Sequence, residues 1–200
     1  MDGSAQMIDA FVKIDELVTL AINGVYSPFT DRMWQLFSEI RIWFPLYAFI
    51  MFILIRRFGW KRGLVYILSL VLGLVLCDQI SNLFKYSVGR LRPCCDWEMM
   101  SGGLRVLEDR GGYYGFFSAH AANVFSLAVA SSIEMKSDDS SHWRIYSAFI
   151  FIWASLVAIS RVFVGKHFFG DVLVGTAVGL AIGVVMGLLA RKVAAIFSES

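Results

Sequence analysis

The stretch "SRVFVGKHFFGD", Ser160–Asp171, carries an arginine, a lysine, a histidine and an aspartate between two of the most apolar runs of the chain. "IYSAFIFIWASLVAI" (Ile145–Ile159) precedes it and "VLVGTAVGLAIGVVMGLLA" (Val172–Ala190) follows it. Runs of this composition are typical of helices that cross a bilayer, which need about 20 mostly apolar residues. Ionisable side chains at the junction of two such helices are costly to bury and usually mark function.

The composition is that of a protein solvated by lipid. Of its 200 residues, 58% are hydrophobic and 17% charged, and the mean hydropathy is +0.65. Soluble domains have roughly 45–50% apolar and 25% charged residues. Three more candidate spans lie at Ile42–Ile55, at Gly63–Cys77 with an extension toward Phe84, and at His120–Ile133, which is short and partly polar. We therefore predict an all-α fold, a polytopic membrane helix bundle of about five to six transmembrane helices.

The N-terminal region is predicted to form amphipathic surface helices. Residues 8–22 form an amphipathic pattern that favours a helix lying along the membrane surface. Its apolar face carries Ile8, Phe11, Val12, Val18 and Ile22. A second short helix is expected at residues 30–40, and the acidic N-terminus lacks the features of a signal peptide. We expect residues 1–200 to form one integral-membrane domain, with surface helices in 1–40 and a transmembrane bundle over 42–195 that includes an active-site loop at 85–117.

Several classes of partner are disfavoured. The net charge of +2 and the lack of a basic stripe argue against nucleic acid. The three cysteines form no CxxC pair, which argues against zinc, and the adjacent Cys94 and Cys95 are expected to be free thiols. We predict no cofactor and no metal, and the sequence leaves the oligomeric state open.

The loops predict an orientation in the membrane. The short loop between the first two spans holds four cations, Arg56, Arg57, Lys61 and Arg62. If the spans alternate, this loop shares one side with the segment Glu134–Arg144. Because short cytoplasmic loops are enriched in Lys and Arg, we expect this side to face the cytoplasm. The loop Lys85–Phe117 and the opening stretch then lie on the other side.

Three polar segments meet on that other side. They are "KYSVGRLRP" (Lys85–Pro93), "FSAH" (Phe117–His120) and the opening stretch. Taken alone, each segment has a structural explanation. Lys85 and Arg92 can be anchors at the membrane surface, His120 an interior histidine, and Arg161 and Asp171 an ion pair. Together they suit a phosphate, because arginine matches its geometry and lysine adds charge.

The expected phosphate ligands come from all three segments. Free backbone N–H groups at the start of the third span add an anion site, and a small residue there admits close approach. The candidate phosphate-binding residues are Lys85, Arg92, Ser118, Ala119 and Arg161.

Two histidines near a bound phosphate favour phosphoryl transfer. Asp171 follows His167 by four residues, about one helical turn, and a carboxylate can hold one imidazole nitrogen while the other attacks. This pairing makes His167 the nucleophile and leaves His120 to protonate the leaving oxygen. His142 lies in the loop on the opposite side and is given no role.

The three segments, read as K-x6-R-P, S-x-H and S-R-x5-H-x3-D, resemble in this order the type 2 phosphatidic acid phosphatase family. The resemblance, with its span pattern from about residue 42 to 190, implies a six-helix-type bundle, a phosphohistidine intermediate on His167, no metal and a site on the non-cytoplasmic face. Two departures from the family's usual P-S-G-H are Phe117, expected to alter the mouth of the site, and Ala119, expected to preserve activity.

The resemblance implies a bacterial inner-membrane enzyme that hydrolyses a phosphate or diphosphate from a lipid headgroup. Undecaprenyl diphosphate, phosphatidylglycerol phosphate and lipid A are the substrate candidates.

The alternative is a non-enzymatic transporter or channel for an anion, which is weaker because the ionisable groups cluster at one face. Glycines in the loop after Cys94 are compatible with either a mobile lid or a merely disordered connector. A glycine ladder in the last span, Gly175, Gly179, Gly183 and Gly187, favours helix packing within the bundle over a dimer interface.

Overall fold

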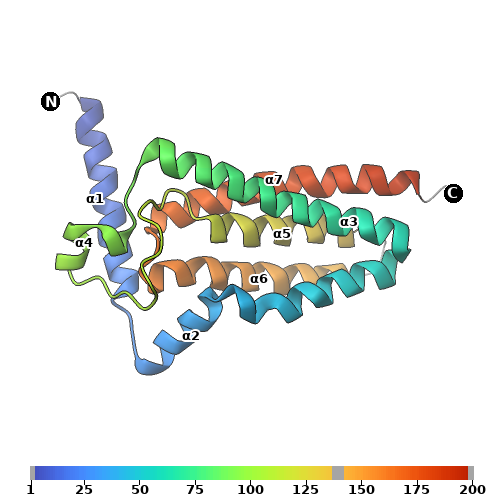
Figure 1. Ribbon diagram of the computed structural model, residues 1–200, viewed down its shortest axis with the longest axis horizontal. Coiled ribbons are helices and arrows are strands. Elements are labelled where there is room, and N and C mark those ends of the chain that lie inside the picture. The colour runs from blue at the N-terminus through green and yellow to red at the C-terminus, as the bar shows by residue number, and fades with distance from the viewer. Residues whose placement is uncertain (1–2, 137–141, 198–200) are drawn as a thin grey trace.

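The computed structural model describes residues 3–136 and 142–197, and its regular elements are helices (Figure 1). The α-helices are α1 (Gly3–Asn23), α2 (Pro28–Ser38), α3 (Phe44–Val88), α4 (Trp97–Ser101), α5 (Ala119–Met135), α6 (His142–Phe163) and α7 (Phe169–Ile196). Short 3-10 turns lie at Ile40–Trp43 and Pro93–Cys95. The predicted all-α fold is confirmed.

Three helical stretches of the described chain are long and apolar enough to cross a membrane: Ile40–Val88, His142–Phe163 and Phe169–Ile196. The first contains a reversal at Gly59, where the backbone leaves the helical region (φ 78°, ψ 170°), so that α3 consists of two antiparallel arms (Figure 1). The arms pack closely past the turn, because a Cβ on Gly63 would lie 2.8 Å from the Cα of Ile55. With α5, the bundle therefore has five parallel or antiparallel arms, which fits the predicted number of spans.

α5 is a short arm and the most enclosed. Its 17 residues extend only about 25 Å, near the lower limit for a span. It also runs two residues further than the predicted end at Ile133, so that Glu134 is buried and accepts a hydrogen bond from Ser69 instead of lying in a loop. The rest of the predicted loop includes residues 137–141, which lie outside the described residues.

The glycine ladder of α7 packs against α5. A Cβ on Gly183 would lie 2.6 Å from the carbonyl oxygen of Ser126, and one on Gly187 would lie 3.1 Å from the Cα of Ala130. Gly179 has equally little room against the backbone of Ala122. Because these glycines are buried inside the chain, the prediction of packing within one bundle is confirmed.

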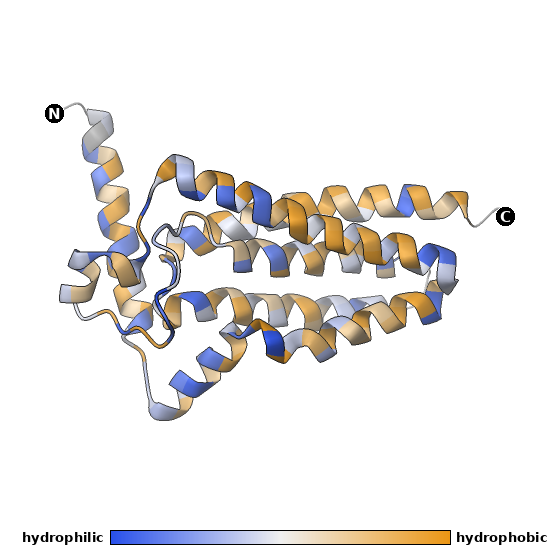
Figure 2. Cartoon of the chain, in the orientation of Figure 1, coloured by the Kyte–Doolittle hydropathy of each residue, from blue (hydrophilic) through white to orange (hydrophobic). Residues whose placement is uncertain are grey.

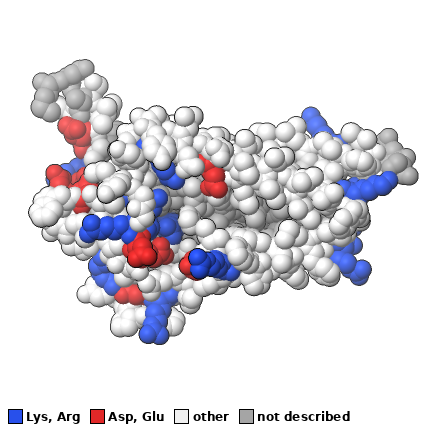
Figure 3. Space-filling view, in the orientation of Figure 1, with Lys and Arg blue, Asp and Glu red and all other residues white. Residues whose placement is uncertain are grey.

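Hydrophobic residues dominate the long helices of the bundle (Figure 2). Large side chains such as Leu68, Leu72, Leu83 and Leu173 are 52%, 54%, 68% and 53% exposed. Charged side chains on the visible face gather at the two ends instead (Figure 3). An apolar flank between charged ends is the pattern of a protein that crosses a bilayer.

Two N-terminal helices lie at one end of the bundle, as expected for residues 1–40. α1 runs crosswise to the bundle, and α2 leads into the first arm of α3 (Figure 1). α2 starts with a capping box, in which the Ser27 hydroxyl accepts from the Thr30 N–H and Pro28 opens the helix. On α1, Ile8 and Phe11 are 61% and 66% exposed, which leaves an apolar face free for lipid.

Candidate active site

The end of α3, the start of α5, the end of α6 and the start of α7 meet at the same end of the bundle (Figure 1). Backbone hydrogen bonds join the polar segments there. The Arg92 N–H donates to the Tyr113 carbonyl (2.8 Å), the Gly115 N–H to the Arg90 carbonyl (2.9 Å), and the Ser118 N–H to the Asp171 carbonyl (3.0 Å). The three polar segments of the sequence are therefore held together in one place.

A cavity of about 500 Å³ opens between these segments. Five predicted ionisable site residues line it together with Ala119: Lys85, Arg92, His120, Arg161 and His167. Aromatic and aliphatic side chains from α2, α3, α5 and α6 complete its wall, among them Trp43, Tyr47 and Val157. We call this the inner cavity. Its mixture of cations and apolar surface suits a phosphate attached to a lipid.

A second cavity of about 820 Å³ adjoins the first, because both are lined by Arg92, His120 and Arg161. We call it the outer cavity. Its own lining is more polar and comes mostly from α2 and the residues after it and from the loop after Cys95, with Lys166 from between α6 and α7. Residues unique to this cavity include Arg32, Gln35, Glu39, Glu108, Gly111, Gly112 and Lys166.

His167 and Asp171 form the predicted pair. The His167 Nδ1 atom lies 3.5 Å from Oδ2 of Asp171, and the two side chains are 2% and 0% exposed. Within residues 3–136 and 142–197, no group completes a hydrogen bond to this Nδ1. Burial lowers the pKa of His167 well below its usual 6.5, and the nearby charges of Arg161, Arg92 and Lys85 lower it further. The imidazole is therefore neutral near pH 7, as a nucleophile must be.

His120 is the second residue of α5 and lines both cavities. Ser118 is the N-cap of this helix and is fully buried. Its hydroxyl accepts from the Ala121 N–H at 3.4 Å, and Ser118 lines neither cavity. The hydroxyl therefore caps α5, while Ala119 lines the inner cavity.

Arg161 is only 4% exposed and has two partners that the sequence did not suggest. Its guanidinium donates to the Ser38 hydroxyl at the end of α2 and lies 3.4 Å from Oε2 of Glu108. Ser38 and Glu108 each lie in a stretch of mixed polar and apolar residues, so neither interrupts a long apolar run as Arg161 does.

Lys166 is a second site residue without a predicted role, although it lies in the opening stretch. It is 6% exposed and donates from Nζ to the Asp109 carbonyl. Burial lowers its pKa, and the neighbouring charges of Arg92 and Arg161 act in the same direction. Its position directly before His167, between two apolar spans, is the sequence signal that could have identified it.

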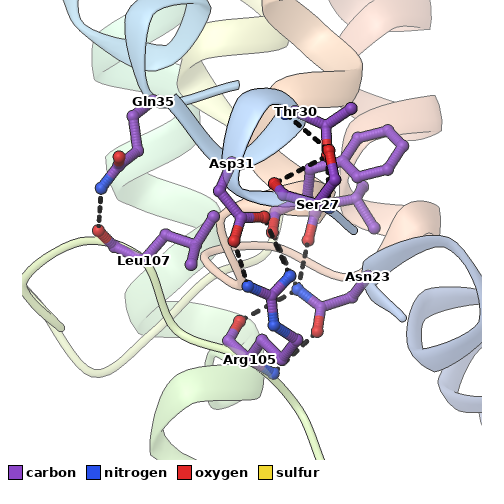
Figure 4. Close-up of polar contacts among 9 residues, drawn as sticks. Asn23, Ser27, Thr30, Asp31, Gln35, Arg105 and Leu107 are labelled. Atoms are coloured by element: carbon purple, nitrogen blue, oxygen red, sulfur yellow. Dashed lines mark hydrogen bonds and ion pairs between the residues drawn. The ribbon is translucent and has the colours of Figure 1, made fainter. Parts of the chain in front are cut away.

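The loop over the site is tied to the N-terminal helices (Figure 4). Arg105 forms a two-pronged ion pair with Asp31 of α2, and its N–H donates to Oδ1 of Asn23 at 2.7 Å. Asn23 also donates to the carbonyl oxygens of Val162 and Phe163 at the end of α6, and Gln35 donates to Leu107. These contacts anchor this part of the loop, so it is not a disordered connector.

Phe117 does not line the mouth of the site, contrary to expectation. It is 1% exposed and packs with Cys77 and Ala122 in a small cluster between the helices. The residue is apolar, and the bundle offers it a buried position behind α5. Cys94 and Cys95 are free thiols, as predicted, with their Sγ atoms 4.0 Å apart. Among the described residues, no group of three or more His, Cys, Asp or Glu side chains is arranged to hold a metal ion.

Comparisons with known proteins agree with this geometry. Lipid A 4'-phosphatase of Bacteroides thetaiotaomicron is 35% identical over 191 residues, covering 94% of this chain and 82% of that protein. Lipid A 4'-phosphatase of Porphyromonas gingivalis is 30% identical over 177 residues, covering 88% and 72%.

Two solved structures share the fold. The PAP2-type phosphatidylglycerolphosphate phosphatase of Bacillus subtilis has a TM-score of 0.73 at 21% identity and covers 92% of this chain and 87% of its own. LpxE of Aquifex aeolicus has a TM-score of 0.62 at 23% identity and covers 84% and 92%. The family model of the PAP2 superfamily matches residues 62–194, which contain all three polar segments, and the chain is therefore a member of the PAP2 superfamily.

Proposed function

We propose that the protein is a membrane phosphatase that removes a phosphate group from a lipid headgroup through a phosphohistidine on His167. The observation that carries this proposal is the inner cavity, where His167 and His120 lie among Lys85, Arg92 and Arg161 at the end of an apolar bundle. The relatives named as lipid A phosphatases support it. They give no support to the alternative of a transporter or channel.

The proposed reaction has two steps. The ring nitrogen of His167 that faces away from Asp171 attacks phosphorus, the P–O bond to the lipid breaks, and His120 gives its proton to the leaving oxygen. Water then attacks phosphorus, His120 takes a proton from it, and the P–N bond breaks to release inorganic phosphate. Asp171 faces Nδ1 of His167 and orients the ring, and the three cations stabilise the charge on the phosphoryl oxygens.

Among lipid phosphates, we propose lipid A as the substrate class. The outer cavity of about 820 Å³ adjoins the reacting groups and is lined by polar side chains, which suits a bulky sugar headgroup. Two relatives that match most of the chain bear the name lipid A 4'-phosphatase. Undecaprenyl diphosphate and phosphatidylglycerol phosphate offer a smaller headgroup and would leave much of this cavity unfilled.

A side-by-side assay tests the substrate. Purified protein would be given lipid A, phosphatidylglycerol phosphate and undecaprenyl diphosphate in the same detergent, with released phosphate as the readout. We expect the highest kcat/KM with lipid A. A higher value for either other lipid would contradict the substrate class, and phosphate release from none of them, with a folded protein, would contradict the phosphatase.

We also propose that residues 1–200 form a single integral-membrane domain in a bacterial inner membrane, with the site facing the periplasm. The cations at Arg56–Arg62 lie at the end of the bundle opposite the site, which supports this orientation. A cysteine at Gly102 should react with an impermeant thiol reagent added outside, and one at Ser140, outside the described residues, only after the membrane is opened. The reverse labelling would contradict the orientation.

A further inference from the structure

The start of α7 is held by a helix from the other end of the sequence. The first N–H groups of a helix have no partner within it and need acceptors from elsewhere. Here α1 provides two of them. Oδ1 of Asp15 accepts from the Gly170 N–H at 2.7 Å, and the Thr19 hydroxyl accepts from the Phe169 N–H at 3.0 Å.

The second oxygen of Asp15 leads toward the catalytic pair. Oδ2 of Asp15 lies 2.7 Å from one terminal nitrogen of Arg90, and the other terminal nitrogen of Arg90 lies 2.8 Å from Oδ1 of Asp171. The guanidinium also lies 3.9 Å above the centre of the Phe168 ring, a cation–π contact that fixes its plane. Arg90 thus bridges a carboxylate of α1 and a carboxylate of α7.

The geometry divides the two oxygens of Asp171 between two tasks. Oδ1 accepts a hydrogen bond from Arg90. Oδ2 accepts a hydrogen bond from the Phe168 N–H at 3.2 Å and faces Nδ1 of His167. Asp171 is completely buried, so its charge and its rotation depend on these few contacts. Without Arg90, nothing else described bonds to Oδ1.

We propose that Arg90 and Asp15 are positioning residues for the reaction, which fix the Asp171 carboxylate so that its Oδ2 orients His167. The inference rests on the proposed role of His167. It also makes α1 part of the catalytic apparatus, although this helix lies outside the residues that the family model matches. The planar fork of arginine is suited to this bridge, because it can offer one nitrogen to each carboxylate.

The test compares Arg90→Met, Asp15→Asn and the double variant with the full-length wild type. The amide oxygen introduced by Asp15→Asn could still accept from the Gly170 N–H, so this variant removes the charge facing Arg90 with little change in shape. We expect each single variant to lower kcat by about 10–100-fold, the range known for removal of the outer hydrogen-bond partners of metal-bound histidines. KM should change by less than about threefold, because neither residue lines the cavities that hold substrate.

The double variant separates positioning from loss of structure. Because both residues act through Asp171, we expect the double variant to be about as slow as Arg90→Met alone, so that the two effects do not multiply. Asp9→Asn, an exposed carboxylate on the same helix, should keep the wild-type kcat. Thermal unfolding of each variant would show that it is folded, and if Arg90→Met is not, Asp15→Asn carries the test by its kcat and KM.

The inference would be overturned if folded Asp15→Asn and Arg90→Met kept kcat within about twofold of wild type, or if their effects multiplied in the double variant. The proposed function is tested separately by His167→Ala. If that variant stays active, the phosphohistidine mechanism is wrong. If it is inactive while the Arg90 and Asp15 variants turn over normally, only the positioning role is wrong.

Discussion

The two ends of the bundle carry similar residues in opposite environments. At the site end, Arg161 and Lys166 are 4% and 6% exposed and lie beside buried His167 and Asp171. At the far end, Arg56, Lys61 and Arg191 are exposed around the turn at Gly59 and the end of α7. Exposed cations at a membrane surface contact headgroups at little cost, whereas buried ones must be stabilised by partners or by a ligand.

The difference shows that the number of charges does not locate the site. The buried charge of Arg161 is stabilised by contacts with Ser38 and Glu108, and that of Asp171 by an ion pair with Arg90. Arg57 and Arg62 at the far end lie over the ring of Phe58 at 5.6 and 5.5 Å and remain partly exposed. We therefore expect substitutions at the site end to change chemistry and matched substitutions at the far end to change almost nothing.

The largest effects should come from the two histidines. His167→Ala should abolish turnover of lipid and of p-nitrophenyl phosphate, because no other described group is placed to accept the phosphoryl group. His120→Ala should lower lipid turnover by about 10²–10⁴-fold but spare part of the activity on p-nitrophenyl phosphate, whose leaving group hardly needs a proton. Asp171→Asn should fall between the two.

Steady-state kinetics of these variants on both substrates would check the roles, after each is shown to fold. Loss of all activity in His120→Ala together with retained lipid turnover in His167→Ala would reverse the assignment.

A matched pair of arginines tests the contrast between the ends directly. Arg161→Met removes a buried donor from the phosphate site, and we expect kcat/KM to fall by about 10²–10³-fold, the usual effect of losing one donor to a reacting oxyanion. Arg56→Met at the far end should stay within about twofold of wild type, as exposed substitutions generally do. Equal losses in the two variants would show that burial does not distinguish the ends.

The pH profile should reflect the same buried charges. Burial and then Arg161, Arg92 and Lys85 lower the pKa of His167, so its imidazole stays neutral and reactive below pH 6.5. The acid limb of kcat/KM should therefore lie below pH 6.5. In Arg92→Met one of these positive charges is gone, the imidazolium forms more easily, and the acid limb should move to higher pH.

Arg56→Met is the control for the pH profile and should leave the limb in place. A limb in Arg92→Met that stays or moves to lower pH would mean that His167 is not the group that titrates.

The sequence predicts the parts of this molecule where polarity contrasts with the surroundings. His120, Arg161 and His167 stand out because they interrupt apolar runs, and all three line the inner cavity. The arms of the bundle follow from the same contrast, and the glycine spacing of α7 indicated its close packing on α5.

Contacts made within polar segments could not be predicted in this way. Asp15 reaches Arg90, and Ser38 reaches Arg161, only because the helix ends converge in space. Nothing in the local sequence separates these residues from polar neighbours that face water. Phe117 illustrates the converse. An apolar residue next to a polar motif can face the cavity or the core, and here Phe117 packs in the core with Cys77 and Ala122.

The smallest expected effect is that of metal removal. Asp171 was the only carboxylate in the predicted site, but Asp78, Glu39 and Glu108 also line the cavities. Asp78 accepts from Asn123 at 2.9 Å, and Glu108 pairs with Arg161, so each is already committed to a neighbour. A magnesium site usually needs one or two carboxylates that converge with water on one ion, and the cations around the inner cavity would repel it. We therefore expect full activity on lipid in excess chelator, and inhibition by vanadate, which can adopt a geometry like that of the transferring phosphoryl group. Loss of activity in chelator that magnesium restores would mean that a metal, not the arginines at the site end, neutralises the phosphate.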